Sequence, residues 1–222
     1  MNKILLSLSL ATVIYGCGAA ERARNPFLER DYVMADSMHY DHLVIDELRK
    51  IVPGTISGIK KSTNNETKTG GITEAMQFEY EATPDNNNDY DKVKATLKKK
   101  GYLLFKSEEN FGNGPDKFAV IKTKDQFDIL RFKATNGRNY DITTDSILTK
   151  LKAWYTRFQF EITGADDDWV EIKLGNISAP DATEFAKEVY EFCPGIAEQD
   201  EETVDNLAID ILQTKIMFLW WQ

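Results

Sequence analysis

The chain has 222 residues, of which 42% are hydrophobic, and it carries a formal net charge of −9 at pH 7. An acidic surface repels nucleic acid and anionic lipid headgroups, so the composition argues against a nucleic-acid partner and favours a basic protein or peptide. The length suffices for one domain, or for two closely packed halves with a substantial core.

The N-terminal segment is typical of an exported bacterial protein. Lys3 precedes residues 4–14, which are uncharged and mainly apolar. This run is shorter than the ~20 apolar residues that a membrane-spanning helix needs, so it predicts a cleaved signal peptide. The following Ile14-Tyr-Gly-Cys17 resembles the bacterial lipobox, which implies cleavage after Gly16 and a diacylglyceryl group on Cys17. Ordinary signal-peptidase cleavage, with Cys17 unmodified, is the alternative.

A lipid on Cys17 would hold the protein in the cell envelope, anchored to a membrane on its periplasmic or surface side. Removing residues 1–16 takes away one basic and no acidic residue, which leaves a net charge of about −10. Cys193 would then have no cysteine partner, so a disulfide framework is excluded and the fold must rest on its core. Residues 17–31 are largely polar, without periodicity, and predict a tether.

Residues 32–124 predict an N-terminal α+β part. Two segments have apolar residues at helical spacing and end at glycine or proline, and three short runs are typical of strands. Residues 60–71 have no apolar stripe and predict a loop. The expected elements are helices at 43–51 and 90–97 and strands at 76–80, 102–105 and 118–122.

Residues 125–222 predict a C-terminal α+β domain. Its clearest element is a hairpin in which residues 158–162 and 170–174 alternate between apolar and polar side chains. A capping box at residue 178 begins a helix, and residues 216–221 are all apolar, as in a strand buried in the sheet. The other expected elements are a strand at 127–134 followed by a tight turn at Asn136-Gly137, and helices at 143–158 and 204–212.

Together these elements define an α+β fold, with a mixed or mainly antiparallel sheet and helices packed on it. The order helix, strand, turn, strand occurs twice, from about Asp89 and from about Thr143. A repeated order of this kind is compatible with two α-β-β units.

Six short motifs in the C-terminal part carry a family resemblance. They are Phe127-Asp-Ile-Leu-Arg131, Asn139-Tyr-Asp141, the helix ending in Trp154, Trp169-Val-Glu-Ile172, Tyr190-Glu-Phe-Cys-Pro194 and Leu219-Trp-Trp221. With them, residues from about Asp125 to Gln222 resemble the bacterial domain of unknown function numbered 4253. Members often end in an acidic residue, where this chain has Gln222. The resemblance implies a fold and domain limits but no reaction.

Charged side chains on an expected strand give the first candidate binding residues. In a strand over 127–134, Asp128 would share one face with apolar residues and Arg131 would share the other. Charges on apolar faces need partners, which would be each other across neighbouring strands, the strand ends or a ligand. Tyr140 and Asp141, just beyond the tight turn, would line the same site.

No motif in the sequence predicts a metal, a cofactor or a catalytic residue. Cys193 lies at the expected end of a helix between apolar neighbours, which favours a structural role over a reactive thiol. His39 and His42 supply two ligands where a zinc site needs three or four. Asp166–Asp168 lack the spacing of a calcium loop and are typical of a hairpin tip.

Two hypotheses for the function follow. The favoured one is a non-enzymatic binding or interaction module, displayed on a tether in the cell envelope. The alternative is a small hydrolase with an unrecognised carboxylate site that uses Asp128, Asp141 or Asp166–Asp168. Converging carboxylates of perturbed pKa in a cleft would favour the enzyme, whereas a flat acidic or aromatic face would favour the module.

Overall fold

The computed structural model describes residues 27–221, except 63–71, 82, 84 and 198–202. The expected signal peptide, Cys17 and residues 18–26 of the expected tether lie outside the described residues. The last residues of that tether, 28–31, form the first turn of helix α1 (Leu28–Ser37). Asp31 is fully buried there and accepts a hydrogen bond from Arg49 Nε (2.7 Å). The folded part of the chain therefore begins before residue 32.

One mixed sheet runs through the described residues. Its strands, in order across the sheet, are β1 (Ile56–Lys60), β2 (Glu74–Tyr80), β4 (Asp116–Ile121), β3 (Leu103–Glu108), β5 (Phe160–Ala165), β6 (Trp169–Leu174) and β7 (Ile216–Trp220). Neighbouring strands are antiparallel, except that β3 and β5 are parallel. A mixed, mainly antiparallel sheet with helices confirms the predicted α+β class.

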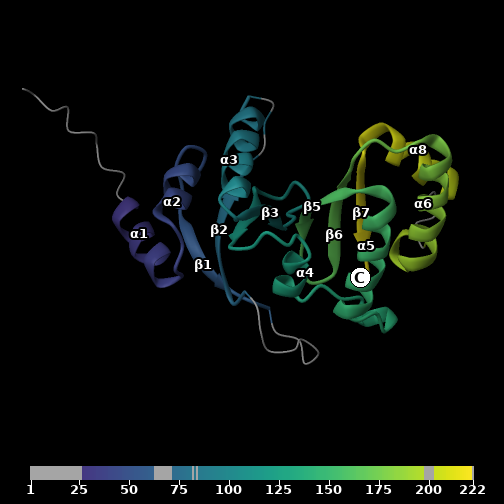
Figure 1. Ribbon diagram of the computed structural model, residues 1–222, viewed down its shortest axis with the longest axis horizontal. Helices are drawn as coiled ribbons and strands as arrows, with labels where there is room; N and C mark the ends of the chain where they lie inside the picture. Colours follow the sequence, from purple (N-terminus) through teal and green to yellow (C-terminus); the bar gives the residue numbers. More distant parts are fainter. Residues whose placement is uncertain (1–26, 63–71, 82, 84, 198–202, 222) are drawn as a thin grey trace, which may run out of the picture.

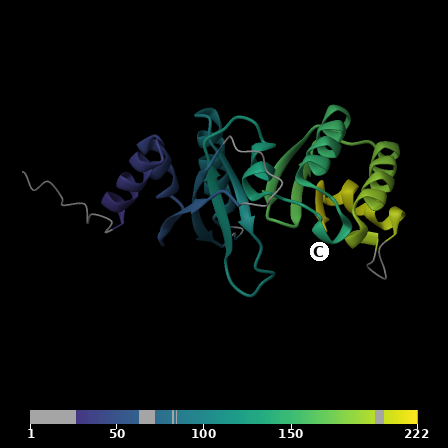
Figure 2. The same cartoon turned by 90° about the horizontal axis from the view of Figure 1, so that it is seen from below.

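The helices pack against opposite faces of the two ends of this sheet (Figures 1 and 2). One hydrophobic cluster joins β1–β4 to α1, α2 (His42–Leu48) and α3 (Asn87–Lys99). The other joins β2–β7 to α4 (Asp128–Lys133), α5 (Thr144–Phe158), α6 (Ala179–Phe192) and α8 (Val204–Thr214). Leu104 and Phe105, adjacent in β3, belong to different clusters, which places the clusters on opposite faces.

Two α-β-β units form the centre of the molecule, in agreement with the repeated order in the sequence. The first is α3-β3-β4 and the second is α5-β5-β6, and each ends in an antiparallel hairpin. β3 and β5 lie side by side, while β2 extends the first hairpin and β7 extends the second. Because the helices of the two units lie on opposite faces, the units are related by an approximate rotation about an axis parallel to β3 and β5.

The strand predicted at residues 127–134 is wrong, because these residues form α4. The apolar residues of this segment could be buried either in a helix or in a strand. The positions of its charged residues favour the helix. Asp128 lies in the first turn and Arg131 in the last, where each charge matches the helix dipole. The two side chains are one helical turn apart and form an ion pair of 2.6 Å.

The tight turn predicted at Asn136-Gly137 does not join two strands. Gly137 instead forms an isolated antiparallel bridge with Ile142, which closes a short loop containing the 3₁₀ turn Arg138–Tyr140. Asn136 stabilises the loop by accepting a hydrogen bond from Arg138 N (3.1 Å). The loop carries the chain from α4 to the start of α5.

Gly164 allows the two units to approach each other. It is the β5 partner of Lys106 in β3, and the Trp169 ring of β6 lies over it. A Cβ atom at this position would lie 2.9 Å from Trp169 Cζ3 and 3.1 Å from Lys106 Cβ. Such distances are shorter than normal van der Waals contact, so a side chain here would force the strands or the indole apart.

We therefore expect Gly164→Ala to lower the free energy of unfolding by about 1–3 kcal/mol, the usual cost of overpacking. Gly114→Ala is the matched control, because a Cβ there would have no neighbour within 4 Å. Urea unfolding followed by circular dichroism measures both variants. Equal transition midpoints for the two variants would contradict the role assigned to Gly164.

Candidate functional site

The two units meet at a parallel strand pair that opens at one end. β3 and β5 pair through one bridge, Lys106 with Gly164. Toward their N-terminal ends, the chain comes from α3 on one face of the sheet and from α5 on the other. The two strands diverge toward that end, and a cavity lies between them there.

The Gln126 side chain forms hydrogen bonds with the backbone of β5 at the point where β3 diverges from it. Its side-chain Nε2 donates to the carbonyl oxygen of Phe160 (3.2 Å), and its Oε1 accepts from Ile162 N (2.9 Å). These are the two kinds of hydrogen bond that a neighbouring strand would make. Asp125 fixes the turn before α4 by accepting from Phe127 N (3.0 Å). The opening between β3 and β5 is therefore compatible with a fully paired β5.

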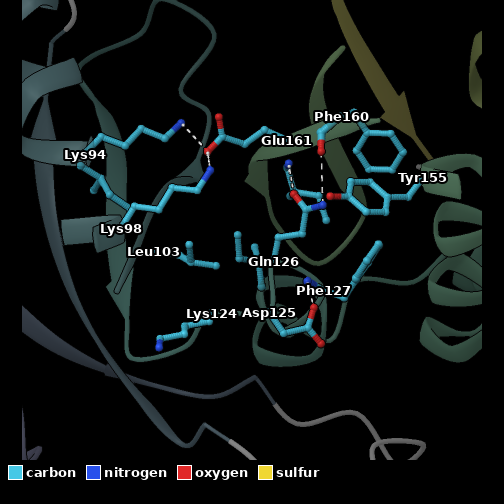
Figure 3. Close-up of a pocket in the computed structure, with 13 residues that line it drawn as sticks. Lys94, Lys98, Leu103, Lys124, Asp125, Gln126, Phe127, Tyr155, Phe160 and Glu161 are labelled. Carbon is cyan, nitrogen blue, oxygen red and sulfur yellow. Dashed lines mark hydrogen bonds and ion pairs between the residues drawn. The ribbon is translucent and has the colours of Figure 1, made fainter. Parts of the chain in front are cut away.

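This opening holds a cavity of about 250 Å³, termed the crevice. Lys94 and Lys98 of α3 both point toward Glu161 of β5 across its upper side (Figure 3). The Nζ atoms of Lys98 and Lys94 lie 3.1 Å and 3.7 Å from Glu161 Oε1. Lys124 and Tyr155 line other parts of the wall. The ion-paired side chains thus connect the helix of the first unit to the sheet of the second.

The charges around Glu161 are unequal. Burial lowers the pKa of Lys94, and the nearby Lys98 and Lys173 act in the same direction. Burial alone would raise the pKa of Glu161, but Lys94 and Lys98 outweigh it and hold that pKa below its usual value. One ionised carboxylate is therefore shared by several lysines, and the cluster keeps an excess of positive charge in a protein of net charge −9.

A larger cavity of about 630 Å³, termed the groove, lies on the other side of the same ion pairs. Its floor is the face of β5–β7 that points away from α5, α6 and α8. Most of the polar and apolar side chains on that face are partly or fully exposed, and α3 forms the wall beside it. The floor residues that line the groove are Glu161, Thr163, Glu171, Lys173 and Ile216.

Aromatic rings and a paired lysine complete the groove. Tyr90, Tyr80 and Phe118 form its apolar side, with ring centroids 5.3–5.6 Å apart. Burial raises the pKa of Tyr90, so its phenol stays protonated. Lys106 is held by Glu109, whose contact is short, and by Glu171 at 3.3 Å. The lining therefore offers an apolar surface, hydrogen-bonding groups and cations in one place.

The outer edge of the sheet next to the groove is largely blocked. In β7, the backbone of Trp220 faces away from β6, and its carbonyl oxygen accepts from Cys193 Sγ (2.9 Å). Trp220 N donates to the same sulfur (3.0 Å). At the other end of the strand, the Thr214 hydroxyl bonds to both Ile216 N and Ile216 O (3.1 and 3.2 Å). An added strand would find these edge groups already occupied.

Cys193 thus has a structural role, as its sequence context favours. The residue is fully buried, and burial raises the pKa of its thiol to about 12. We expect Cys193→Ala to lower the free energy of unfolding by about 1–3 kcal/mol, because it leaves the partly buried N–H and C=O groups of Trp220 without their partner. Cys193→Ser, which keeps a donor and an acceptor, should lose less. Urea unfolding measures both, and an alanine variant as stable as the native chain would contradict this role.

The four candidate binding residues do not line the crevice or the groove. Asp128 and Arg131 pair with each other, and Asp128 also accepts from the Thr123 hydroxyl (2.6 Å). Tyr140 is partly buried against the core of the second unit. Asp141 follows it with a left-handed backbone (φ 55°). The structure thus gives Asp128 and Arg131 a local helical partner in place of the cross-strand partners that the sequence suggested.

The other polar clusters are explained locally. Burial raises the pKa of Asp166 and of Asp168 at the β5–β6 turn, and Lys133 Nζ lies 2.7 Å from Asp166 Oδ1. His42 Nε2 lies 2.8 Å from Asp36 Oδ1. Within the described ranges, no three His, Cys, Asp or Glu side chains come together as metal ligands. In the same ranges, no helix is both long and apolar enough to cross a bilayer.

The fold and its cavities define an α+β protein with two joined units and a mixed-charge crevice between them. Residues 117–222 match the family model described as "Domain of unknown function (DUF4253)". This is the family that the sequence motifs resemble, so that interpretation is confirmed for the C-terminal part of the chain. No curated protein and no solved structure matches the chain.

Proposed function

We propose that this protein is a cell-envelope lipoprotein and that its folded part is a non-enzymatic module that binds a protein or peptide. The groove beside α3 is the observation that carries the binding proposal. Its volume of about 630 Å³ falls within the range of ligand sites. Its lining combines exposed Ile216, the ring of Tyr90 and the lysines around Glu161. A mixture of apolar and charged groups of this kind is typical of binding surfaces.

The state of the carboxylates supports binding over hydrolysis. A general acid or base works best when its pKa lies near the working pH. Glu161, at the boundary of both cavities, has its pKa shifted downward by lysines. Asp166 and Asp168 have raised pKa values, but they line neither the groove nor the crevice. The carboxylates with raised pKa values, which a hydrolase would need, therefore lie outside both cavities.

The partner would lie across the face of the sheet and not along its edge, since Cys193 and Thr214 occupy backbone groups of β7. The local excess of lysine favours an acidic segment of that partner, although the net charge of the whole chain favours a basic one. Apolar side chains of the same segment would pack on Ile216 and the tyrosine rings.

Site-specific photo-crosslinking in cells tests this proposal. Ile216 is 45% exposed in the groove, and Ile209 of α8 is 50% exposed outside it. With a benzophenone amino acid in place of each, we expect a discrete protein adduct from Ile216 and none of the same mass from Ile209. Adding Lys173→Glu should weaken that adduct severalfold, because it reverses a charge on the groove floor. The same adducts from both positions, or none from Ile216, would contradict a partner in the groove.

The membrane anchor is proposed from the sequence alone, because Cys17 lies outside the described residues. The lipobox-like Ile14-Tyr-Gly-Cys17 supports it. The described fold begins at α1, so residues 18–27 would be the link between the lipid and the first helix. Ten residues span at most about 35 Å when fully extended. A lipid on Cys17 would thus keep the folded part close to the membrane surface.

We expect Cys17→Ser to abolish palmitate labelling and to move the protein from the membrane fraction to the soluble fraction. The physical reason is that the acyl chains supply the membrane affinity, and serine offers no thiol for their attachment. Cys193→Ser is the matched control, since that thiol is buried and should carry no lipid. Labelling and membrane partition of Cys17→Ser equal to the native chain would exclude the anchor.

A further inference from the structure

The crevice has the features of a second site, separate from the groove. Three lysines reach it, namely Lys94, Lys98 and Lys124, and two acids line it, namely Asp125 and Glu161. Asp125 is already engaged, because its carboxylate accepts from Phe127 N and pairs with Arg131 (3.1 Å). Glu161 is therefore the acid left to balance the three lysines.

Lys124 is the cation without a counter-charge. Among the described residues, its ammonium group has neither an ion pair nor a hydrogen bond, and the stem of the side chain lies over Gly101. In the view of Figure 3, Lys124 and Lys98 lie on either side of Leu103. Lysine side chains are long and rotatable, so both ammonium groups can turn toward an anion placed between them.

Aromatic side chains form the inner wall of the crevice. The Tyr155 ring makes edge-to-face contacts with Phe160 (5.4 Å) and Phe127 (5.9 Å). Its hydroxyl has no hydrogen-bond partner among the described residues, and Figure 3 shows it directed toward Gln126. Gln126 itself is held in place by one hydrogen bond donated to β5 and one accepted from it. One phenolic hydroxyl and an apolar aromatic wall thus face the same space as the lysines.

We infer that the crevice binds a small organic anion, with a carboxylate or phosphate ester held by Lys98, Lys94 and Lys124 and a flat apolar body against Tyr155. The acidic group of the ligand would add negative charge beside the three lysines, which Glu161 alone does not balance. The volume of about 250 Å³ limits the ligand to roughly the size of a substituted aromatic ring. The Tyr155 hydroxyl would donate to, or accept from, a polar group on that ring.

The choice of variants separates this site from the groove. Lys94 and Lys98 line both cavities, so their substitution affects both. Lys124 lines the crevice alone, and Lys173 lines the groove alone. Lys124→Gln and Lys173→Gln therefore form a matched pair that removes one positive charge from one cavity at a time. The two proposals can therefore be tested independently. A result that excludes a protein partner in the groove leaves anion binding in the crevice possible, and a result that excludes the anion leaves the partner possible.

Isothermal titration of the purified full-length chain with phenyl phosphate and with benzoate tests the inference. We expect saturable binding of at least one of them, weakened about tenfold by Lys124→Gln and changed less than twofold by Lys173→Gln. Lys98→Gln, at a largely exposed side chain, serves as a second variant and should also weaken binding. Higher salt should lower the affinity, since the contact is electrostatic.

Three results would overturn the inference. The first is no saturable binding of either probe at millimolar concentration. The second is an equal loss with Lys173→Gln, which would place the anion in the groove. The third is equal affinity for inorganic phosphate, which would remove any role for the aromatic wall. Thermal unfolding of each variant confirms that it is folded before the titration.

Discussion

The architecture depends on the parallel contact between β3 and β5. Each α-β-β unit builds its own hairpin, but the two hairpins become one sheet only where Lys106 meets Gly164. A side chain larger than hydrogen at residue 164 would collide with Trp169, so the close approach is possible only with glycine. The strands separate toward their N-terminal ends, where the chain enters them from opposite faces of the sheet. The crevice is the direct result of that separation.

The same geometry explains why positive charge collects there. α3 covers the first unit only, so the side chains on its outer flank reach across to the uncovered face of β5. Lysines on that flank gain a carboxylate partner in Glu161, and Glu161 gains a pKa below its usual value. One acid cannot neutralise the lysines that surround it, and burial makes the imbalance more costly than it would be in water. An otherwise acidic protein thus has a cationic boundary between its two units.

Local patterns in the sequence predicted the local parts of this structure. The β5–β6 hairpin, the amphipathic α5 and the capped α6 each show their pattern within one short segment, and all three are present. α4 was wrong because six residues are too few to separate a helical period from an alternating one when most of them are buried. α1 was not predicted because its buried positions include Asp31, whose burial depends on Arg49. The crevice could not be predicted at all, since nothing local to Lys94, Gln126 or Glu161 indicates that β3 and β5 will be neighbours.

The family match covers the second unit and, of the first unit, most of β4. It begins at residue 117, inside β4, and extends to residue 222. Gln126, Tyr155 and Glu161 lie within the matched part, whereas Lys94, Lys98 and Leu103 precede it. A ligand in the crevice would therefore touch residues from both sides of the match, and its recognition would depend on how the first unit docks on the second. For the same reason, the groove needs both the wall formed by α3 and the floor formed by β5–β7. Any activity at these cavities belongs to the joined units, because the matched domain by itself lacks Lys94, Lys98 and the rest of the wall that α3 forms.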